Sequence, residues 1–389
     1  MGRRSRGPAI TNHAFVLGEA RRATHIREGF MEINQANVEQ VLSGFRDPET
    51  GRSVVQQKQV QQIEADGSRI AVTLGLTTHS APIWEDTRQA AEKLLREKFP
   101  AAQTVEVKLA VHQRPPMKLG QIGLSAKSVI AVGAGKGGVG KSTIATSLAL
   151  GLKRTGCQVG LMDADVYGPS VPHLLGVNQR PMTEDNRIVP ITVDGLKVIS
   201  MGFLVPRGEA VVWRGPMLHG AITQFLRDTL WGDLDYLVID MPPGTGDIAL
   251  TLSQLLPLTG AVVVCTPQDV ALLDAEKAIA MFRKVNIPVL GMVENMSYFL
   301  CPDNGKRYDI FGHGGAKKRA EELNVPFLGE VPINIQIRIH GDEGQTDRNF
   351  EEETTRESFE QITYRLVRNM ADKLIAGQEP PPLPSLSVL

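Results

Sequence analysis

The chain has few cysteines, no long apolar run and almost no net charge. Its three cysteines, Cys157, Cys265 and Cys301, stand far apart among 389 residues, which excludes a disulfide-rich secreted scaffold and fits a reducing cytoplasm. No apolar run approaches the roughly 18 to 20 residues of a membrane span. A formal net charge of −1 gives no overall reason to expect nucleic acid or an anionic membrane as a partner. We therefore expect a cytoplasmic protein with neither partner.

The length allows two or three domains, and the residue patterns divide the chain into five segments. The Arg-rich start is either a basic arm that we expect to be disordered or sequence upstream of a true start at Met31, and the sequence leaves both open. The predicted segments are a basic arm (1–30), a small α/β domain (31–113), a linker with paired prolines (114–127), the main domain (128–376) and a Pro-rich tail (377–389).

The main domain alternates strand patterns with helix patterns. Most strand candidates are near-continuous apolar runs, which is typical of a parallel sheet covered on both faces. We expect an α/β fold with a doubly wound, mostly parallel sheet and a ligand site at the carboxyl ends of its strands. The predicted strands are Ser128–Gly133, Gln158–Asp163, Leu196–Met201, Tyr236–Asp240, Gly260–Thr266, Val289–Glu294 and Phe327–Val331.

A phosphate-binding loop is predicted between the first of these strands and the helix that follows it. The segment GKGGVGKS, residues 135–142, fits G-x-x-x-x-G-K-[ST] in its strand-loop-helix context. Lys141 is predicted to reach the β- and γ-phosphates and Ser142 to ligate Mg²⁺. Asn295 ends a later strand, and its carboxamide suits the adenine edge. The predicted nucleotide-binding residues are Gly135, Lys136, Gly137, Gly138, Val139, Gly140, Lys141, Ser142, Thr143 and Asn295.

Carboxylates follow two further strands. Asp165 is predicted to orient or deprotonate the attacking water, so Asp165 and Lys141 are the first catalytic candidates. Asp163 is predicted to bond toward the metal or to hold its loop, with a helix N-cap as the alternative. Asp240 ends an apolar strand, as expected of a Walker B acid, and a stiff Pro-Pro-Gly loop follows it. The predicted Mg²⁺ ligands are Ser142, Asp163 and Asp240.

Together these motifs resemble the Mrp (ApbC) group of iron–sulfur carrier ATPases, in the deviant phosphate-loop class that includes MinD and ParA. The segments that carry the resemblance are Lys136 with Lys141, Asp163-x-Asp165, the run 240–247 and Glu294-Asn-Met-Ser297. The small domain also resembles the unit that precedes the ATPase in many members. The resemblance implies ATP, Mg²⁺ and a homodimer in which Lys136 is catalytic, stabilising transition-state charge at the partner's nucleotide.

The resemblance further implies a [4Fe-4S] cluster at the dimer interface, with apo iron–sulfur client proteins and assembly factors as partners. Carriers of this group typically have C-x-x-C here, whereas this chain has Cys301-Pro-Asp-Asn304. A symmetric dimer would then supply two of the usual four sulfur ligands. Cys301 is either a cluster ligand or an unliganded loop cysteine. Cys265 is expected in the core, and Cys157 at the surface near a helix end.

The sequence thus predicts a cytoplasmic, homodimeric, Mg²⁺-dependent ATPase that binds iron–sulfur clusters and transfers them to apoproteins. One alternative is a positioning ATPase of the MinD or ParA kind, which would need a membrane helix or a basic DNA surface, and neither is visible. The other is a nucleotide-binding adaptor that has lost cluster binding. Apolar residues from Phe359 to Leu374 at helical spacing predict a C-terminal helix packed on the main domain.

Overall fold

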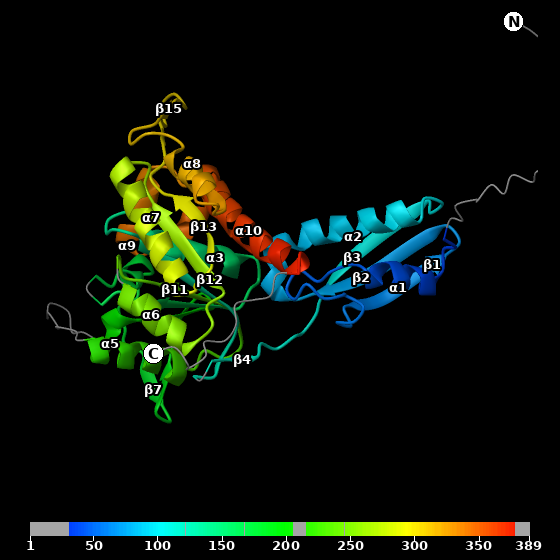
Figure 1. The fold of residues 1–389 in the computed structure, drawn as a ribbon, viewed down its shortest axis with the longest axis horizontal. Coiled ribbons are helices and arrows are strands. Elements are labelled where there is room, and N and C mark those ends of the chain that lie inside the picture. Colours follow the sequence, from blue (N-terminus) through cyan, green and yellow to red (C-terminus); the bar gives the residue numbers. More distant parts are fainter. Residues whose placement is uncertain (1–30, 121, 167, 205–214, 245, 378–389) are drawn as a thin grey trace, which may run out of the picture.

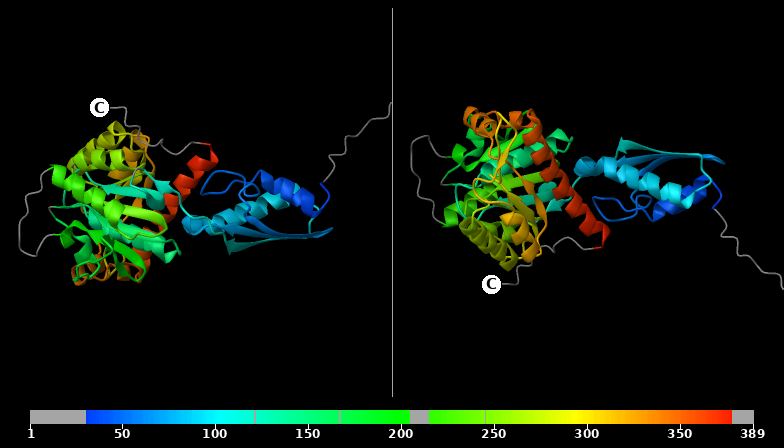
Figure 2. Two further views of the ribbon diagram at one scale, coloured as in Figure 1. Left: turned by 90° about the horizontal axis from the view of Figure 1, so that it is seen from below. Right: turned by 90° about the horizontal axis from the view of Figure 1, so that it is seen from above.

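The computed structural model describes residues 31–120, 122–166, 168–204, 215–244 and 246–377, which form two units (Figure 1). The predicted basic arm, residues 1–30, and residues 378–389 of the predicted tail lie outside the described residues. Figure 2 shows the smaller, N-terminal unit projecting from one side of the larger one.

The N-terminal unit is an α/β unit with the order helix, strand, strand, helix and strand. Its central strand β2 pairs antiparallel with β1 and parallel with β3. Alternate β2 side chains, Ile70, Val72 and Leu74, are buried against Leu42 and Leu95 of the two helices. The elements are α1 (Gln35–Ser43), β1 (Val60–Asp66), β2 (Arg69–Leu76), the 3-10 helix η1 (Thr78–Ile83), α2 (Trp84–Lys98) and β3 (Thr104–Val111).

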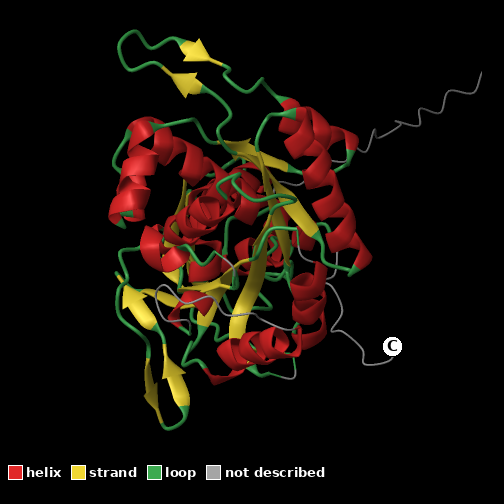
Figure 3. Ribbon diagram, turned by 90° about the vertical axis from the view of Figure 1, so that its left-hand side faces the viewer, coloured by secondary structure: helices red, strands yellow, loops and turns green. Residues whose placement is uncertain are grey.

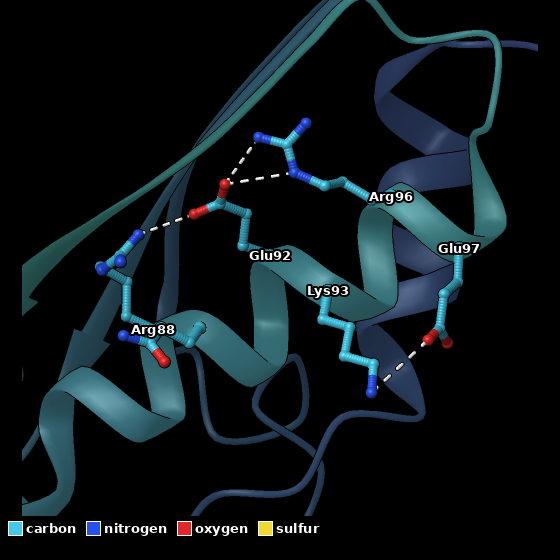
Figure 4. A pocket seen from close by; sticks show the side chains of 6 residues that line it. Arg88, Glu92, Lys93, Arg96 and Glu97 are labelled. Carbon is cyan, nitrogen blue, oxygen red and sulfur yellow. Dashed lines mark hydrogen bonds and ion pairs between the residues drawn. The ribbon is translucent and has the colours of Figure 1, made fainter.

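The outer face of α2 carries a ladder of ion pairs around a surface hollow (Figure 4). Arg88 contacts Glu92 at 2.7 Å, Arg96 contacts the same carboxylate at 2.7 Å, and Lys93 lies 4.0 Å from Glu97. Because these groups are partly or largely exposed to solvent, each pair stabilises the helix only slightly. The hollow is a solvated helix face rather than a closed ligand site.

In the described part of the chain, the second unit is built on a nine-stranded sheet with the order β16-β13-β12-β5-β11-β6-β10-β9 and β4 beside β5. The strands from β16 to β10 are parallel, whereas β9 and β4 pair antiparallel with their neighbours. The predicted doubly wound α/β fold is confirmed. The parallel strands are β5 (Leu124–Gly133), β6 (Val159–Asp163), β10 (Leu196–Ser200), β11 (Leu234–Asp240), β12 (Gly260–Cys265), β13 (Val289–Glu294) and β16 (Phe327–Glu330).

Both faces of this sheet are buried. On β5, Ile130 and Val132 face the core formed with α3 and α10, whereas Val129 and Ala131 face the core formed with α5, α6, α7 and α8. This explains why the strands are near-continuous apolar runs. The helices are α3 (Lys141–Arg154), α4 (Val171–Leu174), η2 (Met201–Phe203), α5 (Gly215–Asp228), α6 (Gly246–Leu255), α7 (Asp269–Lys284), α8 (Gly315–Glu322), α9 (Ile335–Glu343), η3 (Thr346–Phe350) and α10 (Glu353–Ile375).

Short strands complete the unit, and two hairpins project from it (Figure 3). The first strand, β4, lies inside the predicted linker, and β5 begins at Leu124, before the predicted start at Ser128, because β4 pairs with its first residues. The short strands are β4 (Lys118–Leu119), β7 (Met182–Glu184), β8 (Arg187–Val189), β9 (Ile191–Val193), β14 (Phe299–Leu300) and β15 (Arg307–Tyr308).

The predicted C-terminal helix is α10. Phe359, Ile362 and Leu366 bury its apolar face in the core of the main unit, and each such side chain contributes roughly 1.5–3 kcal/mol. In Figure 1, α10 extends from the main unit to the N-terminal unit. Arg368 of this helix lies 3.3 Å from Asp86 of α2 and so links the units.

The 3-10 helix η1 docks the N-terminal unit onto the amino ends of β5 and β11. Thr78 Oγ1 donates to Asp235 Oδ2 at 2.6 Å, and His79 Nε2 lies 2.9 Å from Ser128 Oγ. The His79 ring stacks on Tyr236 at 4.5 Å between centroids, and Tyr236 Oη donates to the His79 carbonyl at 2.6 Å. The two units therefore share a specific, buried interface, which we call the seam.

Buried ion pairs extend the seam. Lys127 Nζ lies 3.3 Å from Glu49 and 3.0 Å from Asp235, and Arg114 lies 2.9 Å from Asp47. Lys127 and its two partners are each less than one-tenth exposed. Because buried charges are costly without partners, these contacts fix how the two units meet.

The positions of two cysteines test the sequence predictions directly. Cys265 is buried in β12, as predicted. The prediction that Cys157 lies at the surface is wrong: its side chain is 3% exposed, and Sγ donates to the Thr78 carbonyl at 3.1 Å. The reason is that η1 of the N-terminal unit covers it, a contact between residues 79 positions apart.

Candidate functional site

The predicted phosphate-binding loop connects the carboxyl end of β5 to the first turn of α3. Gly138 and Gly140 both have φ of +79°, the left-handed region that glycine adopts without strain. A Cβ on Gly140 would lie 2.1 Å from Asn295 Nδ2, so a side chain there would also collide. This backbone turns the loop back over the N-terminus of α3, where N–H groups and the helix dipole favour an anion.

Lys141 lies beneath this loop with its ammonium group buried. Its side chain is 7% exposed and contacts Asp240 Oδ1, and Nζ also lies 3.2 Å from Ser142 Oγ. The structure thus brings together three predicted site residues from α3 and β11. The Asp240 carboxylate neutralises the buried ammonium group of Lys141.

Asp240 has the properties of a metal-binding carboxylate. Its side chain is fully buried at the end of β11, and among the described residues Oδ2 has no hydrogen-bond partner. Burial raises the pKa of Asp240, and the nearby Lys141 ammonium opposes that shift. An unpartnered carboxylate oxygen beside the Ser142 hydroxyl is the oxygen donor set that Mg²⁺ prefers, so the residues present fit this ion.

Asp163 and Asp165 come together at the end of β6, the neighbour of β11. Asp163 Oδ1 accepts from the Asp165 N–H at 3.0 Å, and Oδ2 accepts from the Val171 N–H at 3.2 Å and Ser200 Oγ at 2.9 Å. Burial and, to a lesser extent, the nearby Asp240 carboxylate raise the pKa of Asp163 to about 7. Of the predicted roles for Asp163, these contacts favour holding the loop that carries Asp165.

Lys136 belongs to the phosphate-binding loop, and Asn295 contacts that loop from the end of β13. Lys136 is half-exposed at the start of the loop, and within the described residues its side chain makes no ion pair. Asn295 is buried, and its Nδ2 donates to the Val139 carbonyl at 2.9 Å. The Asn295 amide thus holds the loop, and its contact with adenine stays a prediction.

The Pro-Pro-Gly loop after Asp240 contacts the start of the phosphate-binding loop. The Gly244 N–H donates to the Ala134 carbonyl at 3.0 Å. A small cavity of about 140 Å³ separates these loops from Met281 and Phe282 of α7. The following residue, Thr245, lies outside the described residues.

Cys301 lies in the turn of the β14–β15 hairpin, beyond the carboxyl end of β13. Its N–H donates to the Lys306 carbonyl at 3.0 Å, and its side chain is half-buried. Arg307 anchors the hairpin because its guanidinium lies 4.0 Å from the centroid of Tyr298 and 3.6 Å from Glu330. In the described ranges, no group of three or more His, Cys, Asp or Glu side chains is arranged to hold a metal ion.

The sequence patterns missed two kinds of residue. Ser200, which contacts Asp163, is the last residue of β10 and the second-to-last residue of the predicted strand Leu196–Met201. Its place near the carboxyl end of a predicted strand was the signal that could have identified it. Lys127 and Asp235 of the seam carry no local signal, because their partners lie in another unit. No helix in the described part of the chain is both long enough and apolar enough to span a membrane.

The fold and this site define a nucleotide-binding P-loop NTPase. Residues 125–367 match the family described as NUBPL iron-transfer P-loop NTPase, and residues 35–109 match the family described as iron-sulfur cluster assembly protein. The chain belongs to the iron-transfer P-loop NTPase family. The family resemblance stated from the sequence motifs is confirmed.

Named relatives support this membership over most of the chain. An iron-sulfur cluster carrier protein from Deinococcus radiodurans is 48% identical over 78% of this chain and 86% of its own length. The carrier protein of Escherichia coli K12 is 46% identical over 80% of this chain and 86% of its own length. An Archaeoglobus fulgidus nucleotide-binding protein, solved with ADP, is 40% identical with a TM-score of 0.53, over 60% of this chain and 92% of that one.

Proposed function

We propose that this protein is a cytoplasmic, homodimeric, Mg²⁺-dependent ATPase that binds iron–sulfur clusters and transfers them to apoproteins. Family membership and the names of the relatives support the carrier part. The ATPase part rests on one observation. Lys141, Ser142 and Asp240 meet at one point, so that a phosphate-binding cation, a hydroxyl and an unpartnered carboxylate oxygen lie side by side.

Each residue of the site would have a separate role in ATP hydrolysis. When bound, Mg²⁺ would neutralise charge on the phosphate oxygens. Ser142 and Asp240 would hold the ion, and Lys141 would exchange its contact with Asp240 for the β- and γ-phosphates. Asp165 would orient the water whose oxygen bonds to the γ-phosphorus while ADP leaves. Lys136, half-exposed and without an ion-pair partner among the described residues, is free to reach the nucleotide of a second subunit.

A cluster, as the cargo, would be bound through Cys301. A thiolate is the form that ligates iron. Burial raises the pKa values of Cys157 and Cys265 to about 12, so neither is a thiolate at neutral pH. Cys301 alone is half-exposed, on a hairpin at the same end of the sheet as the phosphate-binding loop. Two subunits facing each other at this end would supply two thiolates, and other ligands would complete the set.

The nucleotide part is tested with Lys141→Ala. We expect loss of MgATP binding or turnover, measured by titration with a fluorescent nucleotide and by phosphate release. Lys153→Ala is the matched control, because it removes a lysine from the opposite end of the same helix. Unchanged hydrolysis by Lys141→Ala would show that the phosphate-loop assignment is wrong.

The cluster part is tested by anaerobic reconstitution with iron and sulfide, followed by iron counting and absorption spectroscopy. Cys301→Ala should lose the cluster, whereas Cys265→Ala, which removes a buried thiol, should keep it. Because Cys301 is the single partly exposed cysteine at this edge, a second candidate also has support, an adaptor that binds nucleotide but no cluster. A well-folded wild-type protein that takes up no iron would favour that adaptor.

The alternative of a positioning ATPase has less support. A membrane-binding C-terminal helix would need an available apolar face, and the apolar face of α10 is packed in the core. Sedimentation with liposomes or DNA in the presence of ATP would test this alternative directly.

A further inference from the structure

Ser200 connects two parts of the site that the sequence motifs do not link. It is the last residue of β10, lies directly opposite Asp163 in the parallel β10–β6 pairing, and is fully buried. Its Oγ accepts from the Gly202 N–H at 3.0 Å. Since a hydroxyl has a single proton, that proton is directed to Asp163 Oδ2, 2.9 Å away.

Asp163 in turn fixes both ends of the loop that carries Asp165. One of its oxygens accepts from the Asp165 N–H, and the other accepts from the Val171 N–H at the start of α4. Asp165 closes the middle of the loop, because its Oδ1 accepts from the Gly168 N–H at 3.1 Å. The orientation of the Asp163 carboxylate therefore sets the position of the Asp165 carboxylate.

The turn after Ser200 packs on the same loop. A Cβ placed on Gly202 would lie 3.0 Å from Pro169 Cβ, so η2 and the loop are in close contact. Without the Ser200 hydroxyl, Asp163 Oδ2 would lose its only side-chain donor among the described residues, and the Gly202 N–H would lose its acceptor. Both losses fall on the surface that supports the Asp165 loop, whereas the glycines of the phosphate-binding loop are untouched.

We propose that Ser200 is a positioning residue for nucleotide hydrolysis, which acts through Asp163 to place Asp165 against the attacking water. This inference rests on the proposed ATPase function. A misplacement of about 1 Å at a reacting group lowers a rate by up to roughly a hundredfold. Ser200→Ala should therefore lower kcat about tenfold or more, and should leave the dissociation constant for MgADP within about threefold.

The test measures kcat per nucleotide-binding site, so that unfolded protein in the sample does not lower the apparent rate constant. Ser200→Thr keeps the hydroxyl and should recover most of the rate. Ser53→Ala is the control, because Ser53 is a buried serine of the N-terminal unit whose hydroxyl has no partner among the described residues. It should leave kcat unchanged.

A double-mutant cycle separates positioning from general support of the fold. In the Asp165→Asn background, Ser200→Ala should lower the residual rate less than twofold, since the group that it positions is already impaired. A further tenfold loss there, or an unchanged kcat in Ser200→Ala alone, would overturn the proposal. Absence of ATP hydrolysis by the wild-type protein would instead overturn the proposed function, and with it this inference.

Discussion

Replacing Lys127 by Met should destabilise the seam between the two units. The loss of stability should exceed that caused by removing a surface ion pair. Lys127 is an ammonium group that Glu49 of the N-terminal unit and Asp235 of β11 share, at 3.3 and 3.0 Å. Methionine fills a similar volume but leaves two buried carboxylates short of one positive charge. Removing one partner of a buried ion pair costs about 3–5 kcal/mol.

The lower end of that range applies here, because each carboxylate keeps other partners. Asp235 still accepts from Thr78 Oγ1 at 2.6 Å, and Glu49 still lies 3.1 Å from Arg114. We therefore expect a loss of about 3 kcal/mol in the free energy of unfolding. With a urea dependence of about 3 kcal/mol per molar, the midpoint falls by about 1 M.

The assay is urea unfolding followed by tryptophan fluorescence, for which Trp84 is well placed because its indole donates to the Thr77 carbonyl beside the seam. Lys93→Met is the matched control. Lys93 is 78% exposed and 4.0 Å from Glu97, so its loss should change stability by less than about 0.5 kcal/mol. Equal urea midpoints for the two variants would refute the view that the charges of Lys127, Glu49 and Asp235 are desolvated.

Two further predictions concern pH and subunit contacts. Burial lowers the pKa of His79 from 6.5, so the unfolded chain binds a proton below about pH 6.5 that the folded protein does not. The contribution of His79 to stability should be full above that pH and fall as the pH drops below it, by at most about 1.4 kcal/mol per pH unit. His79→Gln should remove this contribution, measured as the difference between the two proteins in urea unfolding at pH 7.5 and 5.5. Lys136→Ala should spare nucleotide binding yet slow turnover. Mixed dimers with an Asp165→Asn subunit should show whether Lys136 acts on the partner's nucleotide, and turnover unaffected by Lys136→Ala would contradict its assigned role.

The sequence predicted the seven parallel strands and the positions of Lys141, Asp163 and Asp240 at one edge, because each signal is local. A buried parallel strand is an apolar run, and a motif at its end must lie at the carboxyl edge of the sheet. The short strands, such as β4 (Lys118–Leu119) and β15, have only two residues each, too few to show any alternation. They form because a neighbouring strand supplies hydrogen-bond partners. Their formation therefore depends on the folded structure and cannot be predicted from the segment alone.

The seam was not predictable for a related reason. Glu49, Thr78, Lys127 and Asp235 belong to four segments, and each alone has the character of an ordinary surface residue. They form a buried network only when the fold brings the four segments together. The wrong prediction for Cys157 has this same origin, since the helix-end pattern around it is correct but η1 covers it.

The seam and the nucleotide site lie at opposite ends of the same strands. On β11, Asp235 bonds to η1 and Asp240 contacts Lys141, five residues and roughly 17 Å apart. On β5, Ser128 meets His79, and Gly133 leads into the phosphate-binding loop. Because close-packed strands transmit displacement rather than absorb it, the N-terminal unit is part of the support on which the phosphate-binding loop rests. Variants at the seam should therefore be judged by nucleotide affinity as well as by stability.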